Sequence, residues 1–297
     1  MRSPALPLCA ALVAVAFACG GRAADLRKDI EYGRADGESL RLDASVPEGR
    51  GPFPVALLVH GGGWSGGDKS GSDRPGNSAD ITPWFGELTQ AGFTWFSINY
   101  RLAPQHRWPA CLDDVRTAIR WVKANAAAYK GDSGRIVLFG HSAGGQLVCL
   151  AATEPDPGTR VQAVVAFAPV TDHEQDLAAR GGLSPSLQAL LGLPKAVTPA
   201  SRALLRELSP IHHVGPGLPP FLLLHGDADR TVPLAQSLAF QSRLRENGDA
   251  CDLFIIKGAP HGLLTWETWD PGYPARMIAW LKRTLPDPRK QDARSTP

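Results

Sequence analysis

The sequence predicts an α/β fold in which a mostly parallel, twisted sheet carries helices on both faces. Short apolar runs typical of buried strands alternate along the chain with longer segments of helical periodicity. Residues 140–144 read Gly-His-Ser-Ala-Gly and lie between one such run and one such helical segment, which is the setting of a strand-turn-helix motif. With 297 residues, 43% of them hydrophobic and 20% charged, the chain is long and apolar enough for a large core.

The predicted elements follow one another in a regular order. Two segments of alternating polarity, 30–33 and 40–46, predict an antiparallel entry hairpin. Continuous apolar runs then predict buried strands at 54–60, 93–99, 135–139, 161–167, 221–225 and 252–257. Apolar residues at helical spacing predict helices at 82–91 and 113–128, after Ser142, and at 233–247 and 274–285. Pro233 in the first turn and Gly248 beyond the last turn mark the ends of the fourth helix.

One segment interrupts this alternation, a second follows it and a third precedes it. Between 171 and 218 the pattern breaks into short helical pieces among prolines and glycines, which we expect to form a small lid-like insertion. The tail 286–297 is charged and contains prolines, so we expect it to be flexible. Residues 1–23 have the pattern of a signal peptide, which leaves 24–285 as a single domain.

The N-terminus predicts export to the periplasm or the extracellular space. Arg2 precedes an apolar stretch from 6 to 18, and the small residues Gly21 and Ala23 suit cleavage after Ala23. The apolar stretch is too short to span a membrane comfortably, so we expect no transmembrane segment in the mature protein. An alternative is a lipoprotein modified at Cys19.

Charge and cysteine content exclude several classes of function. The predicted signal carries two arginines and no acidic residue, so without it the formal net charge falls from +2 to zero. A neutral chain without a long basic stripe gives no reason to expect a nucleic-acid partner. Cys111, Cys149 and Cys251 are buried thiols in one interpretation and include a disulfide pair in another. Neither C-x-x-C nor H-E-x-x-H occurs, so we expect no metal site and no cofactor.

The residues 140–144 indicate nucleophilic chemistry. In G-x-S-x-G, the two glycines let a strand and a helix approach closely, and a strained backbone exposes the hydroxyl of Ser142 above the sheet edge. The backbone N–H of Ala143 lies at the positive end of the following helix, where it can stabilise an oxyanion.

A nucleophilic serine needs a base and a carboxylate that orients the base. His261 follows the last predicted strand, while Asp227 and Asp229 both follow the strand before it. Since parallel strands present their carboxyl ends at one edge of the sheet, we expect these side chains near Ser142. The spacing alone leaves the choice between the two aspartates open.

Five motifs between residues 30 and 285 together resemble those of one family. They are His60-Gly61-Gly62-Gly63-Trp64, Asn99-Tyr100-Arg101-Leu102-Ala103-Pro104 with Trp108-Pro109-Ala110, residues 140–144, Asp229-x-x-Val232-Pro233, and Pro260-His261-Gly262. With them the chain resembles an α/β-hydrolase of the HGGG-type esterase/lipase group, and specifically its compact members such as feruloyl and acetyl-xylan esterases. The resemblance implies Asp229 as the triad acid, and the N–H groups of Gly62, Gly63 and Ala143 as the oxyanion hole. Trp64 is a candidate substrate contact, or else it caps the core.

The resemblance implies a serine carboxylic-ester hydrolase that acts through an acyl-enzyme. We expect small or polysaccharide-linked esters, with acetyl or feruloyl groups, as substrates. One alternative is a prolyl-oligopeptidase-like exopeptidase or amide hydrolase, in which the late Asp and His have similar spacing. Another is a non-catalytic binding protein on a hydrolase fold. The sequence does not determine the oligomeric state.

Overall fold

One sheet of eight strands runs through the part of the chain that the structure describes. The structure is a computed structural model, and the described residues are 24–71, 81–175 and 177–287. The predicted signal peptide 1–23 and residues 288–297 of the predicted tail lie outside them. The strand order is β1-β2-β4-β3-β5-β6-β7-β8.

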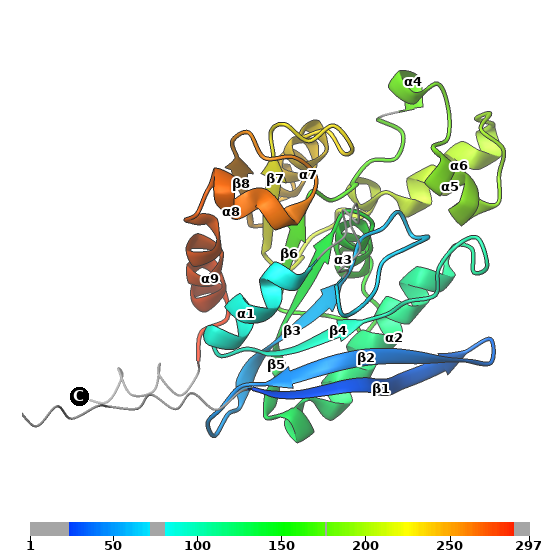
Figure 1. Cartoon of the computed structure of the whole chain (residues 1–297). Coiled ribbons are helices and arrows are strands. Elements are labelled where there is room, and N and C mark those ends of the chain that lie inside the picture. The colour runs from blue at the N-terminus through cyan, green and yellow to red at the C-terminus, as the bar shows by residue number, and fades with distance from the viewer. Residues whose placement is uncertain (1–23, 72–80, 176, 288–297) are drawn as a thin grey trace, which may run out of the picture.

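The sheet is antiparallel at one edge and parallel elsewhere (Figure 1). Its strands are β1 (Asp25–Ala35), β2 (Glu38–Val46), β3 (Phe53–Val59), β4 (Thr94–Ile98), β5 (Gly131–His141), β6 (Ala163–Phe167), β7 (Phe221–Gly226) and β8 (Cys251–Ile256). β1 and β2 form the predicted hairpin, and β2 pairs antiparallel with β4. All pairings from β4 to β8 are parallel, so the predicted fold class is confirmed.

Helices cover both faces of this sheet. They are α1 (Thr82–Gln90), α2 (Ala110–Asn125), α3 (Ala143–Thr153), α7 (Ala235–Glu246), α8 (Trp266–Trp269) and α9 (Tyr273–Thr284). Apolar side chains of α2, α3 and α7 form one core against the sheet, and those of α1, α8 and α9 form the other. Within β3, Val55 and Leu57 belong to the first core while Ala56 and Leu58 belong to the second. Burial on both faces explains why this strand reads as an uninterrupted apolar run.

Three helices differ from the sequence-based prediction. α7 begins at Ala235, so Pro233 lies before the helix and not in its first turn. α2 begins at Ala110 rather than at 113, because Cys111 and Leu112 are buried and belong to its apolar face. α8 was not predicted, since four residues are too few to show a helical period. Its fully buried Trp266 packs close to Phe167 and Tyr273.

Between β6 and β7 the chain forms short helical pieces, as its irregular pattern predicts. These are α4 (Leu177–Arg180), α5 (Pro185–Leu191), α6 (Pro199–Leu208) and the 3₁₀ helix η2 (Pro210–His213). α5 and α6 each begin with a proline, after Ser184 and Thr198, whose side chains accept hydrogen bonds from the first turn. In Figure 1 the three α-helices lie apart from the sheet, at the upper right. Among the helices described, none is long and apolar enough to cross a membrane.

Candidate active site

The turn between β5 and α3 holds Ser142 in a strained conformation. Its φ and ψ are 55° and −117°, a combination that L-residues rarely adopt. The Ser142 N–H donates to the carbonyl of Phe167 at 2.9 Å, which fixes the turn against β6. A Cβ on Gly144 would lie 2.2 Å from the carbonyl oxygen of Val59, and one on Gly140 would lie 2.3 Å from that of Gly144. Only glycine therefore fits at either position.

The structure brings Ser142, His261 and Asp229 together at the carboxyl ends of β5, β8 and β7. The Oγ of Ser142 lies 2.9 Å from Nε2 of His261, and Nδ1 of His261 lies 2.6 Å from Oδ2 of Asp229. An Nδ1–H that donates to the carboxylate leaves Nε2 free to accept from the serine hydroxyl. Asp227, the alternative that the spacing left open, accepts instead from the Gly258 N–H at 2.5 Å.

Four groups converge on the carboxylate of Asp229. Its Oδ1 accepts from the N–H groups of Thr231 and Val232 at 2.8 and 2.9 Å, while Oδ2 faces both His261 and His225. Burial alone would raise the pKa of this carboxyl, but the hydrogen bonds from His225, His261 and Val232 outweigh it and hold the pKa well below its usual range. Asp229 is therefore a carboxylate at neutral pH, suited to stabilise a positive charge on His261.

Two further histidines support this arrangement. His225, at the end of β7, has Nδ1 2.7 Å from the Ser237 hydroxyl and Nε2 2.9 Å from the Val232 carbonyl. Sequence reasoning gave His225 no role, although its place four residues before Asp229 at a strand end was a usable signal. His141 donates from Nε2 to the carbonyl of His261 at 3.0 Å, and its burial lowers its pKa to about 3. It thus positions the backbone that carries the proposed base.

The glycine loop after β3 approaches Ser142 from the other side. Gly62, Gly63 and Trp64 all have positive φ, at 102°, 60° and 59°. Gly63 and Ala143 line the same cavity as Ser142, and Gly62 is not among its lining residues. Trp64 lines the cavity and is also buried in the core. Its Nε1–H donates to Oε1 of Gln146 on α3 at 3.0 Å.

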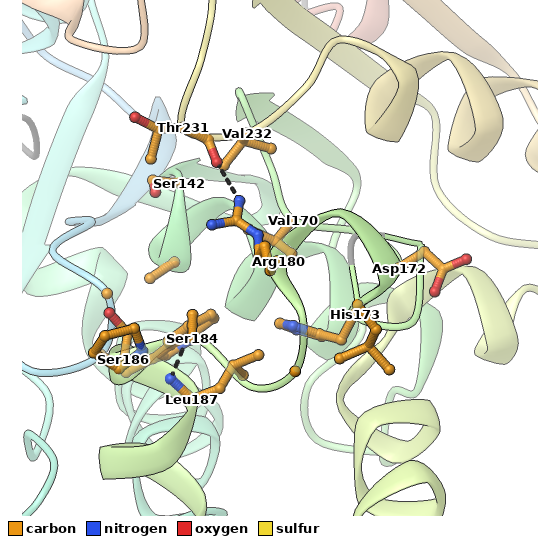
Figure 2. Close-up of a pocket in the computed structure, with 16 residues that line it drawn as sticks. Ser142, Val170, Asp172, His173, Arg180, Ser184, Ser186, Leu187, Thr231 and Val232 are labelled. Carbon is orange, nitrogen blue, oxygen red and sulfur yellow. Dashed lines mark hydrogen bonds between the residues drawn. The ribbon is translucent and has the colours of Figure 1, made fainter. Parts of the chain in front are cut away.

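A cavity of about 270 Å³ opens beside Ser142. Most of its other walls come from the segment between β6 and β7 and from the loop after β7 (Figure 2). They consist of Val170, Asp172, His173, Leu177, Arg180, Gly182, Ser184, Pro185, Ser186, Leu187, Thr231 and Val232. The guanidinium of Arg180 donates to the Thr231 carbonyl at 2.7 Å, which joins the insertion to the loop that carries Asp229.

The described part of the chain shows no disulfide among its cysteines and no side-chain cluster that could hold a metal ion. Cys111, Cys149 and Cys251 are free, buried thiols, so none of these three joins a disulfide. Burial raises the pKa of Cys111 and Cys251 to about 12, which keeps both protonated at neutral pH. Across 24–71, 81–175 and 177–287, no group of three or more His, Cys, Asp or Glu side chains could hold a metal ion.

Comparison with known sequences gives a consistent family assignment. The sequence model of the BD-FAE family matches residues 42–244. "Probable carboxylic ester hydrolase LipM" of Mycobacterium tuberculosis is 35% identical over 230 residues, which cover 73% of this chain and 50% of LipM. "Esterase LipQ" of the same organism is 35% identical over 236 residues, covering 75% of this chain and 53% of LipQ. The chain thus spans about half the length of the curated relatives it matches.

Comparison with solved structures gives the same fold. An acetyl ester-xyloside bifunctional hydrolase from Caldicellulosiruptor lactoaceticus superposes with a TM-score of 0.71 and 25% identity, over 86% of this chain and 95% of that one. A truncated carbohydrate esterase from gut microbiota superposes with a TM-score of 0.73 over 90% of this chain and 99% of that one. At 23% identity, the second likeness concerns the fold alone.

Proposed function

Since the chain belongs to the BD-FAE family of α/β-hydrolases, we propose that it hydrolyses carboxylic esters with Ser142, His261 and Asp229 as its triad. The observation that carries the proposal is the pair of hydrogen bonds, 2.9 and 2.6 Å long, that links the three side chains beside the cavity. The names of LipM and LipQ as ester hydrolases support the same reaction.

The proposed reaction proceeds in two steps through an acyl-enzyme. His261 takes the proton of Ser142 as the serine oxygen attacks the ester carbonyl, and the carboxylate of Asp229 stabilises the resulting imidazolium. The N–H groups of Gly62, Gly63 and Ala143 stabilise the oxyanion, and each such donor contributes about 10²–10³-fold to turnover. His261 then protonates the leaving alcohol, after which a water activated by the same histidine hydrolyses the acyl-enzyme.

We further propose short-chain or carbohydrate-linked esters, with acetyl or feruloyl groups, as the substrate class. An acetyl ester-xyloside hydrolase among the structural neighbours supports this choice. The cavity of about 270 Å³ exceeds the needs of an acetyl group, so part of the alcohol or a larger acyl group fits beside Ser142. The segment 171–218, whose side chains form much of the cavity wall, serves as a partial lid in this proposal.

The test compares the wild-type protein with Ser142→Ala. Wild type should hydrolyse p-nitrophenyl acetate and react with a fluorophosphonate, while Ser142→Ala should lose at least about 10⁴-fold in kcat and all labelling. Hydrolysis that survives in Ser142→Ala would contradict the proposal.

Faster cleavage of an aminoacyl-p-nitroanilide than of the acetate would favour the amide-hydrolase alternative. Acetylated xylan and methyl ferulate then compare the two proposed acyl groups.

Export is a separate proposal, based on the signal pattern in residues 1–23. The intact mass of the protein recovered after expression with its N-terminus should correspond to a chain that begins at Ala24. A mass that retains residues 1–23 would contradict cleavage, and an added diacylglycerol on Cys19 would favour the lipoprotein alternative.

A further inference from the structure

A buried histidine outside the proposed triad lines the cavity beside Ser142. His173 follows β6, and its side chain is part of the cavity wall although the residue is only 4% exposed. Its backbone is fixed, because the His173 N–H donates to the Ser209 hydroxyl at 2.9 Å. Figure 2 shows the ring directed toward the space between Arg180, Ser186 and Leu187, which line the same cavity.

The imidazole of His173 has unused hydrogen-bonding capacity. Its Nε2 is buried and has no hydrogen-bond partner. Burial lowers the pKa of His173 to about 3, so the ring is neutral at neutral pH and offers one N–H donor and one nitrogen acceptor. Buried polar atoms in folded proteins are nearly always paired, and an unpaired one beside a binding cavity is a feature that a ligand can satisfy.

The surroundings indicate which kind of group would pair with this ring. Trp64 packs against it, with ring centroids 5.5 Å apart, and Val170, Leu177 and Leu187 add apolar walls. A charged group would lose its hydration beside these apolar side chains. Two charged residues line the same cavity, but Arg180 already donates to the Thr231 carbonyl and Asp172 already accepts from the Glu174 N–H. A hydroxyl can both donate and accept, so it satisfies His173 in either tautomer and brings no charge.

We propose that His173 is a specificity-determining residue that forms a hydrogen bond with a hydroxyl group of the bound ester. The proposal rests on the proposed function, because it assigns the hydroxyl to the substrate of the Ser142 reaction. The hydroxyl belongs either to the acyl half or to the alcohol half of the ester, and the two sources present the same chemistry to the ring.

The test uses two pairs of esters that differ by hydroxyl groups. Methyl 4-hydroxycinnamate against methyl cinnamate probes the acyl half, and glycerol monoacetate against propyl acetate probes the alcohol half. For wild type, His173→Phe and His173→Gln, the measurement is the ratio of kcat/KM within each pair. The matched control is His213→Phe, which changes a histidine of η2 that bonds the Glu207 carbonyl and does not line the cavity.

We expect wild type to prefer the hydroxylated ester of one pair by about tenfold, as one well-placed hydrogen bond allows. His173→Phe should bring that ratio close to one, His173→Gln should restore part of it, and His213→Phe should leave it unchanged. The pair that responds identifies the half of the ester that reaches His173. Because each ratio is internal to one variant, partial misfolding does not change it.

Two outcomes would overturn the proposal. A wild-type ratio near one in both pairs would mean that the ring binds water or plays a structural part only. A preference that His173→Phe retains would assign the hydroxyl to another residue. Both outcomes require an active enzyme, so they differ from the failure of the proposed function, in which hydrolysis does not depend on Ser142.

Discussion

The carboxyl edge of the sheet and the segment between β6 and β7 meet at one cavity but are built in different ways. At the sheet edge, positions are fixed by backbone contacts that tolerate no side chain, as at Gly140 and Gly144, and by the strained turn at Ser142. In the segment between β6 and β7, short helices are held by capping side chains, by a few polar contacts and by buried leucines of the first core, among them Leu187, Leu190 and Leu205.

Hydrogen bonds anchor this segment near both ends and also at α5, where the Leu190 carbonyl accepts from the Trp108 N–H at 3.0 Å. Near its start, the N–H and hydroxyl groups of Thr171 both bond to Gln236 of α7. Near its end, Gln146 of α3 donates to the Leu208 carbonyl at 2.7 Å. Beside the cavity, Arg180 donates to the Thr231 carbonyl. From this difference we infer that residues of the sheet edge carry out the reaction, while the segment between β6 and β7 determines which esters fit the cavity.

The largest expected effect is at the sheet edge. Asp229→Asn should lower kcat for p-nitrophenyl acetate by about 10³–10⁴-fold, because the amide no longer holds His261 in the tautomer that accepts from Ser142. Asp227→Asn is the matched control, since its amide oxygen can still accept from the Gly258 N–H, and its effect should stay within about threefold. Equal losses in the two variants would contradict the assignment of Asp229.

The Asp229→Asn variant also gives a prediction for acid stability. The pKa of Asp229 is lowered in the folded protein, so its ionised form stabilises the fold above the usual carboxyl pKa, and this contribution is lost as the pH falls further. Between pH 5 and pH 3, wild type should therefore lose more free energy of unfolding than Asp229→Asn. Urea unfolding at the two pH values measures the difference, and parallel losses would count against the lowered pKa.

A smaller effect is expected where the two regions touch. A Cβ at Gly63 would lie 2.8 Å from the hydroxyl oxygen of Ser186 on α5, and the φ of Gly63 is 60°. Gly63→Ala should lower kcat/KM by about 10²-fold, because it moves an oxyanion donor or pushes α5 away. Ser186→Gly, added to Gly63→Ala, separates the two causes. Recovery in the double variant assigns the loss to the contact with α5, and no recovery assigns it to the backbone of the loop.

The sequence predicted the sheet edge better than the cavity walls. Ser142 and His261 follow apolar strands, so periodicity and motif spacing were enough to place them. Asp229 was separated from Asp227 only by the family resemblance, because both lie in the same turn after β7. His173 had no such signal: it follows β6 in a segment without regular period, and its burial arises only when that segment folds over Trp64.

The smallest expected effect tests whether the segment between β6 and β7 selects substrates. Arg180→Ala removes the hydrogen bond to the Thr231 carbonyl, which as an exposed contact is worth about 0.5–1.5 kcal/mol, or two- to tenfold. Because that bond closes one side of the cavity and does not touch Ser142 or His261, KM should rise by this factor while kcat changes little. The effect should be larger for methyl ferulate than for p-nitrophenyl acetate, since a larger ester contacts more of the wall. Arg202→Ala, which removes an arginine of α6 paired with Glu174 away from the cavity, should leave both constants near wild type. A loss confined to kcat in Arg180→Ala would instead place this segment within the catalytic machinery. That result would contradict the inference that the segment acts only on substrate fit.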